Sequence, residues 1–230
     1  MTARDIVRAA SFRAIRRLLA LIRLVCLTAL CGAKLGAPLT AQVAPRALDM
    51  SVGARGGAQR AAVSAWYPVV QLAGRLHVGV LARVSAYGGD PIAYRNRGTV
   101  QGALASSLII DPAVYALNGA VFGELGLLAP IALGANLDLV GVATGPTRTA
   151  GPLTMKPQAL SYFRYGSADR GALNSEFFVS MRVAPRLRLR AGLSHYVTDY
   201  TVTDTGASGA PGSRYQKFQT VPFVAVTLRR

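Results

Sequence analysis

Segments in which apolar and polar residues alternate recur along the chain after residue 46, and a period of two is typical of β-strands with two different faces. Each segment has at least nine residues, which is long enough to cross a bilayer as a tilted strand. No helical period of useful length appears after residue 42. The pattern predicts eight strands, at 47–55, 60–69, 75–87, 113–127, 131–144, 172–183, 187–201 and 217–229.

The connections between these segments alternate in length. Short turns follow the second, fourth and sixth segments, with the sequences VQLAG, APIA and APR. Longer polar connections follow the third, fifth and seventh, at 88–112, 145–171 and 202–216, and only the first odd connection, GGAQ, is short. Bacterial outer-membrane barrels have tight periplasmic turns and longer external loops, whereas a soluble sandwich has no reason to alternate in this way.

The stretch LGANLDLVGVATG (133–145) indicates which face is which. Strict alternation puts Asn136 and Asp138 on one face, together with Val140 and Val142, and leaves the opposite face purely apolar. In a soluble sheet the polar face meets water, but in an outer-membrane barrel the apolar face meets lipid and the polar face lines the lumen. Because the loop lengths favour the barrel, we expect Asn136 and Asp138 to point into a lumen and Leu137 to face lipid.

Charged residues recur on the expected inner face of several segments. A barrel of eight strands leaves an interior just wide enough for side chains to fill, and buried charges are costly unless they are paired. The sequence therefore predicts a lumen plugged by one network of ion pairs. The expected members are Asp49, Arg55, Arg83, Glu124, Asp138, Glu176, Arg182, Arg188 and Arg190.

Two further features bear on the barrel. Pro222 lies inside the last segment and has no N–H to donate, so a bulge or a shortened pairing is expected there. Aromatic residues near strand ends are expected to form girdles at the membrane interfaces. These are Trp66, Tyr67, Tyr87, Tyr196 and Tyr200.

The N-terminal segment has the three parts of a secretory signal peptide. Five arginines precede the apolar run LLALIRLVCLTALCGA, and a small residue, Ala41, precedes the expected cleavage site. Arg23 and the shortness of the run argue against a membrane anchor helix. The sequence thus divides into a signal peptide (1–41), read by the Sec pathway, and a barrel domain (42–230). Both cysteines, Cys26 and Cys31, fall in the signal peptide, so the exported part has no disulfide.

The exported part remains strongly basic. It keeps 19 of the 26 Lys and Arg residues and nine of the ten acidic residues, a net charge of +10. Such basicity can indicate nucleic-acid binding, but the chain has no basic helix or aromatic-basic motif, and an exported protein rarely meets nucleic acid. The expected partners are outer-membrane lipid, the phosphates of lipopolysaccharide and, during biogenesis, the barrel-assembly machinery. We expect a monomer in the outer membrane.

Four stretches resemble a known family: ALNGAVFGELG (116–126), LGANLDLVGVATG (133–145), LNSEFFVSMRVAPRLRLRAGLSHYVTDYT (173–201) and VPFVAVTL (221–228). They are similar to the small outer-membrane β-barrel proteins of the Bacteroidetes-like outer-membrane-barrel family. The resemblance covers 47–230 and implies an all-β, eight-stranded antiparallel up-and-down transmembrane barrel without an assigned enzymatic activity. It implies no catalytic residues.

Catalytic chemistry finds little support in the residues. Ser194 and His195 are the one pair that invites a hydrolase interpretation, but neighbours in a strand point to opposite faces. Glu124 and Glu176 would serve as an acid–base pair only if their pKa values diverged. His77 is isolated, and no cluster has the spacing of a metal site. We therefore predict no catalytic residue, no metal and no cofactor.

The function expected from these observations is a structural, envelope or surface-interaction role of a plugged outer-membrane barrel. One alternative is a lipid-modifying outer-membrane enzyme of the lipid A deacylase type. Another is a secreted, soluble, lipocalin-like barrel that binds an apolar ligand, which requires an apolar interior and a polar exterior.

Overall fold

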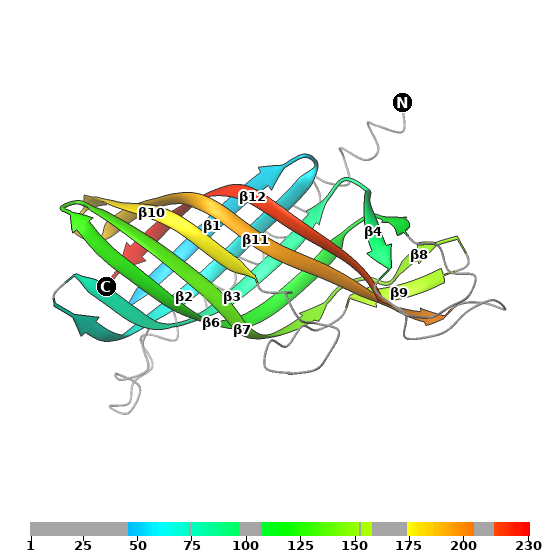
Figure 1. The fold of residues 1–230 in the computed structure, drawn as a ribbon, viewed down its shortest axis with the longest axis horizontal. Helices are drawn as coiled ribbons and strands as arrows, with labels where there is room; N and C mark the ends of the chain where they lie inside the picture. The colour runs from blue at the N-terminus through cyan, green and yellow to red at the C-terminus, as the bar shows by residue number, and fades with distance from the viewer. Residues whose placement is uncertain (1–45, 74, 97–106, 152, 158–173, 205–213) are drawn as a thin grey trace, which may run out of the picture. The chain divides into compact units, whose positions relative to one another are not determined.

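The structure, a computed structural model, describes residues 46–73, 75–96, 107–151, 153–157, 174–204 and 214–230. In these ranges the chain is all-β and antiparallel, with twelve strands in one sheet (Figure 1). The strands are β1 (Ala47–Arg55), β2 (Ala58–Leu72), β3 (Leu76–Gly89), β4 (Ile92–Asn96), β5 (Ser107–Ile110), β6 (Ala113–Leu128), β7 (Ile131–Thr144), β8 (Arg148–Ala150), β9 (Leu153–Pro157), β10 (Ser175–Ala184), β11 (Leu187–Asp204) and β12 (Arg214–Arg229). No helix in the same ranges is long and apolar enough to cross a membrane. The predicted signal peptide (1–41) lies outside the described residues.

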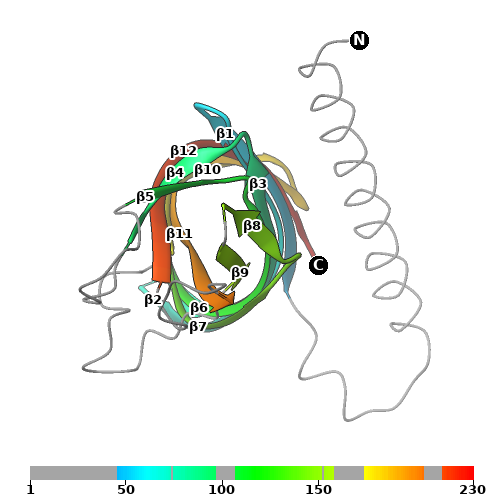
Figure 2. The ribbon, with the colours of Figure 1, turned by 90° about the vertical axis from the view of Figure 1, so that its right-hand side faces the viewer.

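The long strands pair in a circuit that returns to its start. Its order is β1–β2–β3–β6–β7–β10–β11–β12, and β12 pairs back onto β1 from Ala47↔Arg229 to Gly53↔Phe223. Figure 2 shows this circuit end on as a ring. A closed ring removes the unpaired edges that an open sheet would expose.

The strand count differs from the prediction, because the sheet has twelve strands and the sequence pattern indicates eight. Each predicted range overlaps one strand of the circuit, and the bounds of β1 and β7 are the predicted ones. The four further strands, β4, β5, β8 and β9, lie in the ranges 88–112 and 145–171 that were expected to be loops. They have three to five residues each, which is too short for a period of two to be recognised.

The two ends of the ring differ. One end, which we call the short-turn end, carries the turns β2–β3, β6–β7 and β10–β11 together with the first residue of β1 and the last of β12. The opposite end, the loop end, carries the longer connections and the tight β1–β2 turn. In that turn Gly56 and Gly57 both have positive φ, the conformation that a two-residue hairpin of type I′ needs.

At the loop end β11 and β12 run beyond the ring as a hairpin. There β12 pairs with β4 through Tyr215↔Asn96, and β11 pairs with β9 through Tyr200↔Pro157. The pairs β4–β5 and β8–β9 complete this extension, which we call the collar (β4, β5, β8, β9 and the ends of β11 and β12 at 200–204 and 214–216). Arg148 of β8 lies 3.5 Å from Asp111, which directly follows β5. The ion pair joins the two outer hairpins of the collar.

Apolar side chains cover the outside of the ring, and polar side chains fill the inside. On β10, for example, Phe177, Val179 and Met181 are 65%, 47% and 43% exposed, whereas Glu176 and Ser180 are each 1% exposed. The same alternation recurs on β1, β3, β6, β7, β11 and β12. This distribution of apolar and polar side chains is the reverse of the one in a water-soluble barrel.

A bulge in β7 overturns part of the expected alternation. In the pairing with β6, Gly119 lies opposite Val140, and the next residue, Ala120, lies opposite Asp138. Leu139 is therefore the extra residue, and every side chain after it changes face. Asp138 is buried, but Val140 and Val142 are exposed on the outside instead of sharing its face.

Pro222 shortens one ladder and leaves the other intact. The pairing of β12 with β11 runs through Leu193↔Pro222 without a shift, whereas the pairing with β1 ends at Gly53↔Phe223, one residue away. The expected bulge is absent and the expected shortening is present. The missing N–H therefore falls where β12 has already left β1.

The expected aromatic girdles are wrong for most of their members. Trp66, Tyr87, Tyr196 and Tyr200 are buried, and Tyr67 is partly buried. Trp66 lies two residues from Ser64, and Tyr196 lies two residues from Ser194, both of which are also buried. The alternation of the strands thus puts these aromatic side chains on the inner face of the sheet and not at the lipid interfaces.

Candidate functional site

Glu176 is the centre of a buried charge cluster in the ring. Arg60 Nη2 donates to its Oε1 at 2.5 Å, and Arg83 Nη2 donates to its Oε2 at 3.1 Å. Asn136 Nδ2 also donates to Oε2, at 2.6 Å, and Arg190 Nη1 lies 4.0 Å from the same oxygen. One carboxylate therefore contacts three guanidinium groups, which come from β2, β3 and β11.

Arg83 connects Glu176 to a second carboxylate. Its Nη1 donates to Asp138 at 3.0 Å, its Nη2 also donates to Asn136 at 2.8 Å, and its Nε donates to Ser64 at 3.3 Å. Asn118 Nδ2 donates to the other oxygen of Asp138 at 2.5 Å. All nitrogens of this guanidinium thus have acceptors, as a fully buried arginine requires.

Arg190 forms the third part of the cluster. Its Nε and Nη2 donate to the two oxygens of Asp49 at 3.1 and 2.5 Å. This bidentate contact fixes the orientation of both side chains. Its guanidinium carbon lies 4.6 Å from the ring centroid of Trp66 and 4.3 Å from that of Phe178. Cation–π attraction of this kind is strong where water is excluded.

Small residues make the room that these side chains need. The ring of Phe178 occupies the place where a Cβ of Gly134 would lie, and Asn118 does the same at Gly141. Ser51, Ser64, Ala62 and Ser85 are buried on the same inner face. Any larger residue at Gly134 or Gly141 would displace a member of the interior packing.

The predicted network is therefore brought together in part. Glu176, Asp138, Arg83, Asp49 and Arg190 meet in the cluster described above, while Glu124 and Arg188 form a separate ion pair toward the short-turn end. Arg55 and Arg182 are not part of it, because both side chains are exposed. Arg55 ends β1 at a turn, and Arg182 lies where the β10–β11 ladder shifts register.

Sequence reasoning missed Arg60, which carries one of the shortest ion pairs of the cluster, and also the amides Asn118 and Asn136 as bridging groups. The signal for Arg60 was available in the alternation, since it shares the face of Ser64 and Trp66.

A cavity of about 340 Å³ lies at the short-turn end. Its charged lining consists of Arg46, Arg188, Arg190, Arg229, Arg230 and a single acid, Glu124. Its apolar lining includes Trp66, Pro68, Val69 and Phe122. In β2 the ladder shifts between Pro68 and Val70, so Val69 is a bulge residue on this rim.

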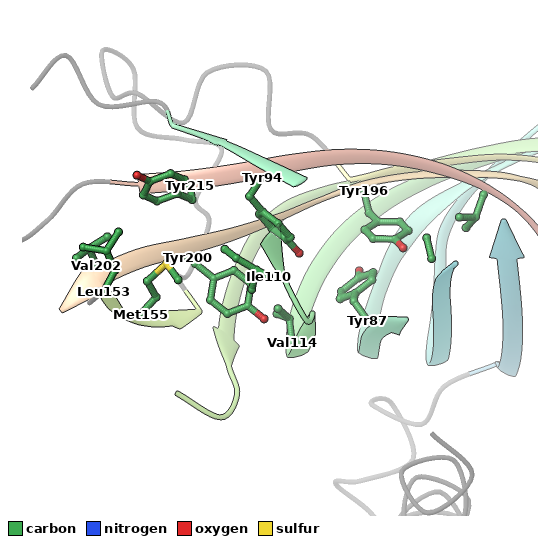
Figure 3. Packing of buried hydrophobic residues seen from close by; sticks show 12 residues of the cluster. Tyr87, Tyr94, Ile110, Val114, Leu153, Met155, Tyr196, Tyr200, Val202 and Tyr215 are labelled. Carbon is green, nitrogen blue, oxygen red and sulfur yellow. The ribbon is translucent and has the colours of Figure 1, made fainter. Parts of the chain in front are cut away.

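The loop end is filled by a tyrosine cluster (Figure 3). The Tyr87 and Tyr196 rings face each other with centroids 4.5 Å apart, and Tyr94 meets Tyr200 edge to face at 5.4 Å. Tyr94 also shares a hydrogen bond of 2.8 Å with Thr198, and burial raises the pKa of its phenol well above the usual range. Among the described residues, these rings pack with Ile110, Leu153 and Met155 of the collar into one buried cluster.

The one pair that suggested hydrolysis does not meet. Ser194 is buried inside, whereas His195 shares a hydrogen bond of 2.9 Å with Thr220 on the outside. His77 lines the cavity opposite Glu124 in the β3–β6 register. Among the residues that the structure describes, no three His, Asp or Glu side chains are grouped as metal ligands would be.

No family model and no curated protein matches this sequence, so the resemblance to the Bacteroidetes-like family stays a prediction. Two solved structures align with most of the chain. Neisserial surface protein A does so with a TM-score of 0.37 and 13% identity, over 80% of this chain and 94% of that one. The outer membrane enzyme PagL does so with a TM-score of 0.32 and 12% identity, over 80% of this chain and 99% of that one.

Proposed function

We propose that the chain is an outer-membrane β-barrel protein of a Gram-negative envelope, that the eight-stranded circuit spans the membrane, and that its interior is plugged by its own side chains. The observation that carries the proposal is the inverted ring, with apolar side chains outside and a paired charge cluster inside. In water such an exterior would be an aggregation hazard, but in a bilayer it is the favourable surface.

The backbone supports the same conclusion. Inside a membrane every N–H and C=O needs an internal partner, so only helices and closed barrels can cross. Here β12 returns to β1 over seven paired residues, and no strand of the circuit is left with an open edge along that length. The strands of the circuit have nine to eighteen residues, which suits tilted crossing of a bilayer.

The filled interior favours a role at the surface over a role as a pore. Arg60, Arg83 and Arg190 with their carboxylates occupy the middle of the ring, and the tyrosine cluster occupies its loop end. The collar is then the part presented to the outside, where it would serve an envelope or surface-interaction role. Export through the Sec pathway, insertion by the barrel-assembly machinery, contact with lipopolysaccharide and a monomeric state belong to this proposal.

The two alternatives are less well supported. A lipocalin-like barrel needs an apolar interior, and this one buries Asp49, Asp138 and Glu176. A lipid hydrolase needs a nucleophile and a base on the same side of the sheet, and Ser194 and His195 lie on opposite sides.

Fractionation of a Gram-negative host that expresses the full chain tests the proposal. We expect the protein in the outer-membrane fraction after carbonate washing, and we expect unboiled samples to migrate differently from boiled ones in a denaturing gel because the folded barrel resists detergent. A soluble periplasmic protein serves as the fractionation control. Recovery of this chain with that control would refute the proposal.

A further inference from the structure

The cavity at the short-turn end has more positive than negative side chains. Five arginines line it, and Glu124 is the only acidic side chain in the lining. Arg188 and Arg229 both contact the same Glu124 oxygen, the latter at 3.6 Å, and Arg190 is already paired with Asp49 beneath the wall. Among the described residues, Arg46 and Arg230 form no ion pair with a carboxylate side chain.

The backbone holds the rim arginines in place. Arg46 N donates to Trp66 O at 3.0 Å, and Arg230 N donates to Arg46 O at 3.0 Å. Arg229 N donates to Arg186 O at 2.8 Å. These bonds fix where the side chains start, so the arginines converge by construction of the ring and not by chance proximity of mobile ends.

Buried donors in the cavity wall are left without acceptors. Arg188 Nε and Arg190 Nη1 are both buried and make no hydrogen bond, although Arg190 Nη1 lies 4.0 Å from Glu176 Oε2 as described above. Arg190 as a whole side chain is only 3% exposed. A buried donor of a charged group that lacks an acceptor costs free energy, and an anion in the cavity would supply one.

An apolar surface stands beside the arginines. Trp66 and Phe122 are buried in the wall, with their ring centroids 4.6 Å apart, and Val69 is exposed at the rim. A cavity of about 340 Å³ is within the size range of small-molecule sites. The wall therefore suits a ligand with a charged end and a short apolar end.

We propose that this cavity binds a phosphate group that carries a small apolar substituent. Phosphate fits better than carboxylate because it offers three oxygens and up to two negative charges, which several guanidinium groups can contact at once. The substituent would lie against Trp66 and Phe122. A free organic phosphate monoester offers all three oxygens, and the phosphodiester of an anionic phospholipid offers two of them with one negative charge; both present a phosphate that guanidinium groups can contact.

The protein carries its own reporter for this site, because Trp66 is its only tryptophan. The full chain, folded in a neutral detergent, is titrated with phenyl phosphate while the emission of Trp66 is followed, and sodium benzoate is titrated in parallel. We expect a saturable change with phenyl phosphate and binding at least tenfold weaker with benzoate. No saturable change, or equal binding of benzoate, would overturn the proposal.

A matched pair of double variants locates the site. Arg46→Gln with Arg229→Gln removes two charges from the rim, and Arg55→Gln with Arg95→Gln removes two exposed charges outside the cavity lining. The first variant should weaken phenyl phosphate binding at least tenfold, and the second should leave it unchanged. Equal binding by both variants would refute the assignment to this cavity.

An experiment in lipid vesicles then distinguishes a lipid headgroup from a free organic phosphate as the ligand. This experiment rests on the proposed membrane location. In phosphatidylcholine vesicles phenyl phosphate should still alter the Trp66 emission. If phosphatidylglycerol in the vesicles abolishes that response, the lipid headgroup occupies the site, and if it does not, a free organic phosphate is the ligand. Because the detergent titration does not depend on location, failure of the binding proposal and failure of the membrane proposal give different results.

Discussion

Removing the Glu176 carboxylate should destabilise the ring more than any other loss of a single acid from its interior. In the central cluster three arginines, Arg60, Arg83 and Arg190, balance three acids, and Glu176 contacts all three. Among the described residues, Glu176→Ala takes away the only carboxylate that forms an ion pair with Arg60 and one of the two that form ion pairs with Arg83. Breaking a buried ion pair by removing one partner typically costs about 3–5 kcal/mol. We expect a loss of that size in the free energy of unfolding.

Urea titration of the protein in detergent or lipid vesicles, followed by the emission of Trp66, measures the loss. Asp111→Ala is the matched control, since it also removes an acid from an ion pair, with Arg148, but its side chain is 57% exposed. An exposed pair contributes about 0–1 kcal/mol. Adding Arg60→Ala to Glu176→Ala should then cost less than Arg60→Ala alone, because the stranded charge is removed. Equal midpoints for Glu176→Ala and Asp111→Ala would refute the reasoning.

Two further predictions concern the faces of the strands, and a third concerns one hydrogen bond. Val179→Arg, on the outside of the ring, should cost about 2–4 kcal/mol of stability in lipid. Ser180→Ala should leave the unfolding midpoint almost unchanged, because the buried Ser180 hydroxyl has no hydrogen-bond partner. Similar midpoints for the two variants would contradict the assignment of faces. A fluorophore attached to a single cysteine should be quenched by a lipid-borne quencher when the cysteine replaces Val142 and not when it replaces Ala143. The reverse result would contradict the bulge in β7. Tyr200→Phe should lower stability by about 1–3 kcal/mol, since its hydroxyl accepts a hydrogen bond of 2.9 Å from a backbone amide of β6, and an unchanged thermal midpoint would argue against that bond.

The alternation of residues in the sequence was sufficient to locate the long strands but not the points where the alternation breaks. The bounds of β7 follow from the pattern, and so does the buried position of Asp138. The faces of Val140 and Val142 do not, because the extra residue Leu139 is defined only by its pairing with β6. A bulge is a property of two strands, and a pattern within one of them does not contain it.

The candidate site could likewise be predicted from the sequence only in part. Acids and arginines of the inner face could be collected from the sequence, since side chains on one face of each strand share a lumen. Which of them meet depends on the stagger between strands, so Arg55 and Arg182 were included wrongly and Arg60 was overlooked. The cavity could not be predicted at all, because three of its five arginines, Arg46, Arg229 and Arg230, come from the two ends of the described chain and meet only when β12 closes on β1.

The collar has a consequence for how this protein can change. Among the described residues, its strands β4, β5, β8 and β9 pair with the ring only through the ends of β11 and β12, and Tyr200 adds one hydrogen bond from Ala113 N of β6. Insertions or exchanged segments in the connections that contain β4, β5, β8 and β9 therefore leave the register of the ring untouched. The tip of the molecule can diverge quickly while the scaffold stays fixed, which makes it a natural place to graft a foreign peptide for display.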